Sequence, residues 1–335
     1  MVAVSLRRKI PFPMQLLISA ALLAASFVLA LTLGAADTGI RDVWQAVFSG
    51  SGEHAAVLRG LRIPRVLAAV FTGAALAVAG AVMQGVTRNP LADPGLLGLT
   101  SGANAALALS LALIPGITYT GILAACFIGA AAGMAIVFSV GAASRGGMSS
   151  MRLVVAGAAV TAFLQAIADG TGIVFRISKD VSMWTAGGLM GTTPDSLIVV
   201  PFIVAGLIGA MFVSRQLTIL SLQEDVAVGL GQRVFLIKAV MMIITALLAG
   251  AAVALVGNLA FVGLIIPHLV RAVTGADYRM ILPMSAIIGA VFMVLADLAG
   301  RLINAPFETP VVAITALIGL PFFLIVVRKG GIGHA

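Results

Sequence analysis

The sequence predicts an all-α polytopic membrane protein with about ten transmembrane helices. Apolar runs of about 20 residues, long enough to span a bilayer as a helix, recur along the whole chain of 335 residues. Hydrophobic residues make up 61% of the chain and charged residues only 10%, whereas a soluble domain is about half apolar and about a quarter charged. The charges lie mainly between the apolar runs. The net charge of +8 therefore indicates orientation in a lipid bilayer, and we expect no binding of nucleic acid.

The predicted spans follow one another without an inserted soluble domain, so we treat residues 1–335 as one transmembrane domain. They cover residues 14–34, 63–85, 93–113, 119–140, 152–173, 196–214, 234–256, 258–273, 281–300 and 309–327. The first run could belong to a cleaved signal peptide. It is too long for the apolar part of one, and we interpret it as a retained helix. The eighth run is short and is broken by Pro267.

The distribution of charge predicts which side of the membrane each loop faces. Ten spans put both termini on one side, and the segments on that side carry 13 of the 20 basic residues but only 4 of the 12 acidic ones. Because lysine and arginine are enriched in cytoplasmic loops, we expect a multi-pass protein with both termini in the cytoplasm.

Small residues crowd the spans, as in residues 72–85 and 245–258. Glycine and alanine let helix backbones approach closely, which in lipid replaces the hydrophobic driving force. These two stretches also resemble each other. The resemblance suggests an internal repeat, roughly residues 60–195 and 234–329, of the kind that many transporters contain.

Several classes of chemistry lack their motifs. An ATP-binding P-loop needs a lysine after a glycine, and none of the lysines follows one. The three histidines are far apart, and neither His-Glu-x-x-His nor Gly-x-Ser-x-Gly is present. The single cysteine, Cys126, cannot form an internal disulfide. We therefore predict no catalytic residue, no metal site and no cofactor bound by this chain.

Coupling to an ion gradient is weakly indicated. A transporter driven by protons or sodium should carry acidic residues deep in the membrane, and only Asp169 and Asp297 come close. Asp297 precedes Arg301 by four residues, so we predict a local ion pair on one helix. An ion-coupled secondary transporter stays open as an alternative, as does a structural or assembly protein that transports nothing.

Residues 215–233 form a polar loop with an amphipathic middle. Its apolar set is Leu220, Leu222, Val226 and Leu230. This pattern predicts a short helix that lies across the cytoplasmic face. Such a helix is either an ordinary interfacial element or a docking helix for a partner.

Several long stretches resemble the FecCD family, the permease subunits of ABC importers for ferric siderophores, haem and vitamin B12. They include "FVGLIIPHLVR" at residues 261–271 and "LADLAGRL" at residues 295–302, and also residues 61–103, 220–231 and 306–329. The sequence departs from the family pattern after Glu308, where Thr309 and Pro310 follow, and in the "GNLA" stretch before Phe261. Both departures lie near the predicted outer mouth and bear on the substrate, not on the fold.

The resemblance implies a fold of the vitamin B12 and iron-complex importer type in a bacterial cytoplasmic membrane. The partners it implies are two ATP-hydrolysing subunits that use ATP and Mg²⁺, a substrate-binding protein, and a second permease that is a copy or a paralogue. Ferric siderophores are the first expectation for the substrate, with haem or vitamin B12 as alternatives. The residues that the resemblance assigns to ATPase docking are Leu222, Glu224, Asp225, Ala227 and Gly231 in the 215–233 loop, with Arg88 and Asp93 in a nearby turn.

The resemblance also assigns residues at the outer face and along the path. Arg62, Arg65 and Arg301 match arginines that dock the binding protein, although interfacial arginines commonly snorkel to lipid headgroups instead. The fifth and tenth spans would line the path, with Gln165, Asp169, Thr309 and Thr315 as polar candidates. Ser149 and Ser150 match a polar pair at the inner gate of B12-type members.

Overall fold

The computed structural model describes residues 10–34, 39–50, 55–142, 150–186, 188–305 and 307–330, and every regular element in these ranges is helical. Each predicted span contains one apolar helix. These are α1 (Phe12–Thr32), α4 (Ile63–Thr87), α5 (Leu99–Leu113), α6 (Tyr119–Ala142), α7 (Ser150–Val174), α9 (Val200–Phe212), α12 (Val234–Val256), α13 (Val262–Thr274), α14 (Tyr278–Leu302) and α15 (Val311–Gly330). The predicted fold class is confirmed.

Helix length divides this set into two groups. Seven helical segments are long and apolar enough to cross a membrane, and two of them run on from short helices, as Ala55–Thr87 and Pro194–Phe212. Three apolar helices are shorter: α5, α13 and the Val311–Val326 part of α15. Each of the three follows a described segment that is not α-helical: residues 88–98, 257–261, and 303–305 with 307–310.

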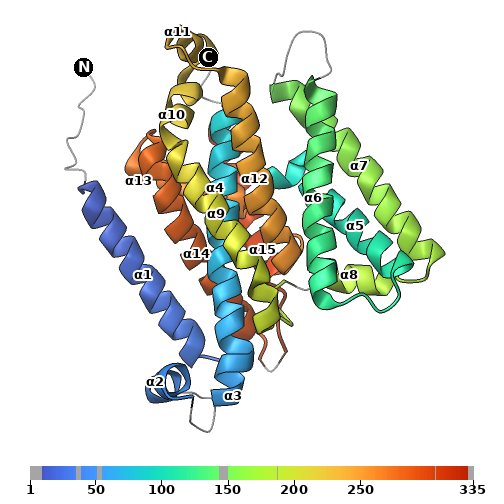
Figure 1. Cartoon of the computed structure of the whole chain (residues 1–335). Coiled ribbons are helices and arrows are strands. Elements are labelled where there is room, and N and C mark those ends of the chain that lie inside the picture. The colour runs from blue at the N-terminus through green and yellow to red at the C-terminus, as the bar shows by residue number, and fades with distance from the viewer. Residues whose placement is uncertain are drawn as a thin grey trace.

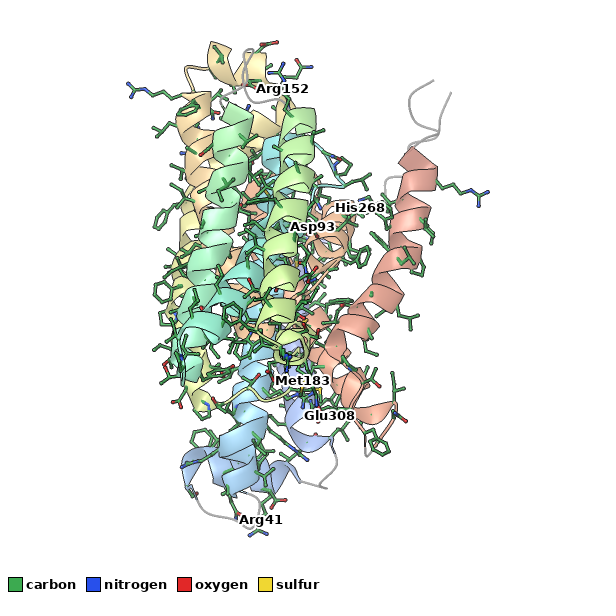
Figure 2. The ribbon with its side chains drawn as sticks, turned by 90° about the vertical axis from the view of Figure 1, so that its right-hand side faces the viewer. Arg41, Asp93, Arg152, Met183, His268 and Glu308 are labelled. Carbon is green, nitrogen blue, oxygen red and sulfur yellow. The ribbon has the colours of Figure 1, made fainter. Side chains whose placement is uncertain are left out.

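Short helices lie at both ends of the bundle. They are α2 (Ile40–Phe48), α3 (Ala55–Val57), the π-helical η1 (Leu58–Arg62), the 3-10 helices η2 (Pro94–Leu97) and η3 (Pro194–Val199), α8 (Ser178–Ala186), α10 (Ser214–Leu222) and α11 (Glu224–Gly229). Figure 1 shows α10 and α11 at the end where α1 begins, which we call the upper end, and α2, α3 and α8 toward the opposite, lower end. Arg152 marks the upper end and Arg41 the lower end in Figure 2.

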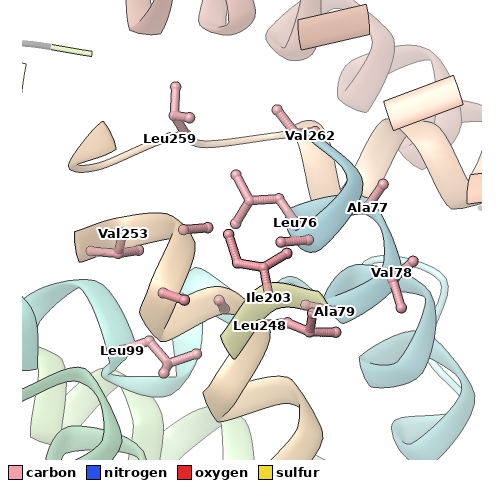
Figure 3. Packing of buried hydrophobic residues seen from close by; sticks show 14 of the residues in the cluster. Leu76, Ala77, Val78, Ala79, Leu99, Ile203, Leu248, Val253, Leu259 and Val262 are labelled. Atoms are coloured by element: carbon pink, nitrogen blue, oxygen red, sulfur yellow. The ribbon is translucent and has the colours of Figure 1, made fainter. Parts of the chain in front are cut away.

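Helix α4 forms the centre of the larger group of helices. It packs against α12, α13 and α14, and 19 of its 25 residues are buried. Two contacts need glycine, because a Cβ at Gly73 would collide with the carbonyl of Gly289, and a Cβ at Gly80 with the carbonyl of Gly263. Figure 3 shows side chains of α4, α9 and α12 meeting in the shared core. The small residues therefore serve close backbone packing, as expected from the sequence.

Helices α5, α6 and α7 form a second group, with α8 below them (Figure 1). Its closest contact is again between glycines, because a Cβ at Gly102 would collide with the carbonyl of Gly129. The two groups are joined mainly through α12 and α6. Whether they correspond to an internal repeat stays a prediction.

The turn between α4 and α5 is longer than the sequence indicated. Arg88 ends α4 in a left-handed conformation with φ of 53°, and α5 begins only at Leu99 rather than near residue 93. Instead, η2 begins at Pro94, and Asp93 caps its start. Asp93 Oδ1 accepts a hydrogen bond from the amide of Gly95 at 2.7 Å. Because proline cannot continue a helix, this segment places irregular backbone inside the bundle.

Candidate functional site

A cavity of about 420 Å³ lies between the two groups of helices. The 91–104 segment and α7 line one side, and the 258–264 segment and α15 line the other. Its polar lining is Asp93, Thr100, Ser101, Asn104, Thr161, Gln165 and Asn258, and its apolar lining includes Leu91, Leu259, Phe261, Leu264 and Phe323. The cavity thus mixes hydroxyl and amide groups with apolar walls and contains one acidic side chain.

Two predicted site residues meet in this cavity. Gln165, a predicted path residue, lines it from α7 and donates to the carboxylate of Asp169 at 2.9 Å. Asp93 lines it from the α4–α5 turn (Figure 2), although we expected this residue at the ATPase-docking surface. Asp169 itself is exposed one turn further along α7. Thr161 Oγ1 is buried without a hydrogen-bond partner in the described part of the chain, so the cavity offers an unused polar group.

Helix α13 is held in place by a side chain that replaces a missing backbone donor. Pro267 lies inside α13 and has no amide hydrogen to donate to the carbonyl of Gly263, four residues earlier. Gln84 of α4 donates to that carbonyl instead, at 3.1 Å. The residue before α13, Phe261, has a φ of 70° and packs against Gly319 of α15, where a Cβ would collide with its ring.

The same glutamine links the cavity wall to the upper end. Arg271, on the last turn of α13, donates to Gln84 Oε1 at 2.6 Å and lies 3.3 Å from the hydroxyl of Tyr278. Tyr278 begins α14, and its amide donates to Thr218 of α10 at 3.0 Å. Hydrogen bonds therefore connect α10 to α14, α14 to α13, and α13 to Gln84 of α4. Gln84 in turn donates to the carbonyl of Gly263, next to the cavity-lining Leu264.

Helices α10 and α11 replace the single helix expected across residues 215–233. Gln223 is extended and separates them. Leu220 is buried, whereas Leu222, Val226 and Leu230 of the predicted apolar set are exposed, with Leu230 65% exposed. Exposed large apolar side chains this close together commonly mark an interaction surface. We call the exposed group of Leu222, Val226, Val228 and Leu230 the upper apolar patch.

The other predicted docking residues surround this patch in different ways. Ala227 is fully buried and anchors α11, while Asp225 is exposed. Glu224 forms an ion pair with Lys238 at 2.8 Å and lies 3.7 Å from Arg88. Gly231 has a φ of 77°, which glycine adopts without strain. Glu224 and Arg88 therefore tie α11 to α12 and to the end of α4.

At the lower end, the three arginines assigned to docking point inward. Arg62 donates to the carbonyl of Leu31 at 2.9 Å, and Arg301 donates to the carbonyl of Ala30 at 3.1 Å. Arg65 forms ion pairs with Asp297 at 2.8 Å and with both oxygens of Glu308 at 2.9 Å. All three arginines thus have partners within the chain, and whether they also dock a binding protein stays a prediction.

The predicted pair between Asp297 and Arg301 is confirmed. Arg301 Nε lies 3.1 Å from Asp297 Oδ2, an ion pair that lacks hydrogen-bond geometry. The side chain of Asp297 is only 2% exposed, and two arginines, Arg65 and Arg301, compensate its charge. Buried charges persist in proteins when they are paired in this way. We call Arg62, Arg65, Asp297, Arg301 and Glu308 the lower charge network.

The remaining path candidates divide between exposed and buried positions. Thr315 is fully buried and donates to the carbonyl of Val312 at 3.0 Å, and its place on a path stays a prediction. Thr309 is partly buried, and its amide donates to the carbonyl of Gly300 at 2.9 Å. Ser149 lies outside the described residues, and Ser150 is the first residue of α7.

Residues that the sequence analysis overlooked include Gln84, Asn104 and Asn258. All three carry an amide side chain within a stretch of small or apolar residues. An amide in such a stretch was the signal in the sequence that could have identified them. Among the described residues, no group of three or more histidine, cysteine or acidic side chains could hold a metal ion.

Comparison with known proteins gives consistent results over most of the chain. The iron(3+)-hydroxamate import system permease protein FhuB of Bacillus subtilis is 45% identical over 313 residues, which cover 92% of this chain and 81% of the relative. The hemin transport system permease protein HmuU of Yersinia pestis is 38% identical over 87% of this chain and 88% of its own. A solved structure described as an inward-facing conformation of a metal-chelate type ABC transporter matches with a TM-score of 0.82 at 27% identity, over 95% of this chain and 100% of that one.

The model of the FecCD transport family matches residues 22–329, which include every spanning helix except the first turns of α1. The resemblance noticed in the separate sequence blocks is therefore confirmed over nearly the whole length. This chain belongs to the FecCD transport family.

Proposed function

We propose that this chain is the permease subunit of an ABC importer that carries a ferric siderophore across a bacterial cytoplasmic membrane. The observation that carries the proposal is its similarity, over nearly the whole chain, to permeases named for iron chelates. The chain supplies the membrane path and no chemical step. ATP and Mg²⁺ are used by separate subunits, in keeping with the missing P-loop lysine.

The upper end is cytoplasmic in this proposal, and the upper apolar patch docks an ATPase subunit. The patch lies on α10 and α11, and the hydrogen bonds of Thr218, Tyr278, Arg271 and Gln84 lead from there to α13. A displacement of α10 would therefore move the element that lines one side of the cavity. Asp93 belongs to the cavity and is left out of the docking set.

The path forms where the cavity meets a second permease, either a copy of this chain or a paralogue. Helices α7 and α15, which both line the cavity, also carry exposed apolar side chains, including Phe163, Ile173, Leu317 and Leu324. A partner helix pair against them would close the open side of the cavity. Gln165 and Asp169 then face the path from α7, and Thr309 lies at its lower mouth.

A substrate-binding protein docks at the lower end. Since Arg65 already holds Glu308, an acidic side chain of the binding protein must compete with this intramolecular partner. Replacing Arg62 and Arg65 by glutamate would disturb the lower charge network in addition to any docking contact. Docking is better tested with Glu308→Gln, because Glu308 is the most exposed acid of the network.

The class of substrate follows from the relatives and from the lining of the cavity. Hydroxamate chelates are the first expectation because the 45% identical relative is named for them, and haem is the second because of the 38% identical relative. The cavity carries amides, hydroxyls and one acid, without a ring of like charges. Such a lining suits weak binding in passage, with selectivity supplied by the binding protein.

An ion-coupled mechanism has less support. Among the described residues of the spanning helices, the buried acid is Asp297, and it is held by two arginines. A proton- or sodium-binding acid should instead be able to exchange its partner during transport.

The test is uptake by proteoliposomes that contain the permease, its ATPase and its binding protein. Radioactive iron as a ferric hydroxamate, a ferric catecholate or haem, and labelled cobalamin, are offered in turn. We expect ATP-dependent uptake of a ferric hydroxamate that a non-hydrolysing ATPase variant abolishes. Uptake driven by a proton or sodium gradient without ATP would contradict the proposal.

A further inference from the structure

Helix α2 leaves an apolar face uncovered at the lower end. Ile40, Trp44, Val47 and Phe48 recur at the spacing of one helix face, and Trp44 and Phe48 are 64% and 67% exposed. The rings of these two aromatic residues lie together, with centroids 4.2 Å apart. A row of exposed large side chains on a nine-residue helix is not explained by packing within the chain.

The rest of α2 divides into two further faces. Ala46 is fully buried and Val43 packs against the core, so one side of the helix faces the protein. Arg41 and Gln45, four residues apart, form the polar side, and Arg41 points away from the spanning helices (Figure 2). The apolar face lies between these two sides. A helix with one side toward protein, one toward water and one apolar side fits the edge of a bilayer.

The orientation of α2 is fixed at both of its ends. The amide of Gly39 donates to Asp42 Oδ2 at 2.8 Å at the start of the helix. The guanidinium of Arg59 donates to the carbonyls of Ala46 and Val47 at its end, where a cation also meets the negative end of the helix dipole. An isolated helix of this length is marginal in water, so these caps hold its apolar face in one direction.

This apolar face continues a surface that must already contact lipid. Helix α1 packs chiefly against α14 and leaves Leu17, Leu22, Val28 and Leu29 exposed. Helix α2 contacts α1 and runs across its direction at its lower end (Figure 1). Because α1 spans the membrane, its exposed side faces acyl chains. The aromatic pair of α2 therefore lies where a membrane protein meets the headgroup layer.

We propose that the Ile40, Trp44, Val47 and Phe48 face of α2 lies in the lipid interface of the outer leaflet and anchors the lower end of α1 there. Tryptophan is enriched at this depth because its ring is apolar and its N–H is polar. The inference rests on the proposed orientation, with the lower end outside, and it holds whatever substrate the permease carries.

The chain contains two tryptophans, Trp44 and Trp184, which makes a direct test available. The Trp184→Phe variant, reconstituted in phosphatidylcholine vesicles, isolates the emission of Trp44, and a Trp184→Phe, Trp44→Phe variant gives the background. Lipids brominated near the headgroup should lower the Trp44 emission about twofold, because an interfacial indole lies at that depth. Lipids brominated near the methyl end of the acyl chain should lower it less, and aqueous iodide should have little effect.

Two results would overturn the proposal. Strong quenching by iodide without quenching by either brominated lipid would place the face in water. Exposure to iodide that is lost only when the substrate-binding protein is added would make the face a protein-docking surface instead. A second variant, Phe48→Lys, is expected to reduce quenching by brominated lipid, with Arg41→Lys as a control that keeps the polar side polar.

Discussion

At the lower end of the molecule three arginines turn inward onto carbonyls and acids, whereas at the upper end four apolar side chains remain exposed on two short helices. Both regions were assigned to partner docking from the sequence. The structure separates them: the upper apolar patch is exposed in the described part of the chain, whereas Arg65 and Arg301 of the lower charge network pair with Asp297. A surface is therefore a candidate interface when its side chains are left exposed and unpaired. Charge alone does not make a residue near the edge of the membrane a candidate for docking.

Removing Arg65 should have the largest effect on stability and tests whether the lower charge network is structural. Arg65→Leu leaves Glu308 unpaired and Asp297, which is 2% exposed, with Arg301 alone. Breaking a buried ion pair from one side costs about 3–5 kcal/mol. We expect a correspondingly large fall in the free energy of unfolding, measured by denaturation of the purified protein in detergent.

The matched control for Arg65→Leu is Arg279→Leu at the upper end. Arg279 also pairs with an aspartate, Asp277 at 2.8 Å, but its side chain is exposed. Exposed pairs add little to stability, so this variant should unfold almost like the original protein. Equal stability of the two variants would mean that the lower charge network is not structural.

A second variant tests the hydrogen bonds that connect the upper end to α13. Gln84→Leu removes the donor to the carbonyl of Gly263 and the acceptor for Arg271. Leaving such buried groups unpaired costs about 1–3 kcal/mol, which the same denaturation measurement would detect.

The proline that created the need for Gln84 supplies the control. Pro267→Ala gives α13 a backbone amide that can donate to Gly263, so it should recover part of the stability lost in Gln84→Leu. In a double-mutant cycle the two changes should therefore be non-additive. Additive losses would show that Gln84 does not replace the missing helix hydrogen bond.

The upper apolar patch should respond in the opposite way, through binding and not through stability. Val226→Ser with Leu230→Ser removes exposed apolar contact area without touching the core. The few residues that dominate an interface lie near its centre and cost more than about 1 kcal/mol when truncated, so the affinity for the ATPase subunit should fall about tenfold. The thermal unfolding temperature of the permease should stay unchanged.

Phe307→Ser provides the control for the patch, because Phe307 is an equally exposed apolar residue near the lower charge network. It should leave ATPase binding unaltered in the same titration. A loss of affinity in both variants would indicate a general effect of surface hydrophobicity, and no loss in either would remove α10 and α11 from the docking site.

The sequence was informative where the signal is local. Hydropathy located the spanning helices and the break between the second and third runs, because an apolar run is read from neighbouring residues. The Asp297–Arg301 pair was predictable for the same reason, since both residues lie on one turn of α14.

The partners across the bundle could not be predicted in this way. Arg65 and Glu308 are 243 residues apart in sequence, and Gln84 and Arg271 are 187 apart. Which side of a helix faces a neighbour, lipid or a cavity depends on how the whole bundle packs. For this reason the sequence could not show that Thr315 is buried or that Asp93 lines the cavity.

The smallest expected effect concerns Asp277 at the upper end and its dependence on pH. Hydrogen bonds from Arg279, and further ones from the Arg279 amide and Thr218, hold the pKa of Asp277 below its ordinary value of 3.8, against the opposing effect of burial. A depressed pKa in the folded state stabilises the protein above the unfolded pKa, and this contribution is lost as the pH falls through the folded pKa. Asp277→Asn should therefore lower the unfolding temperature slightly at neutral pH, and the difference from the original protein should vanish in acid. Thr218→Val should reproduce part of this difference, because it removes one of the hydrogen bonds to the carboxylate. Since the side chain of Arg279 is exposed, the effect should also shrink with added salt. A difference that persists unchanged into acid would show that the cap of α14 does not depend on the charge of Asp277.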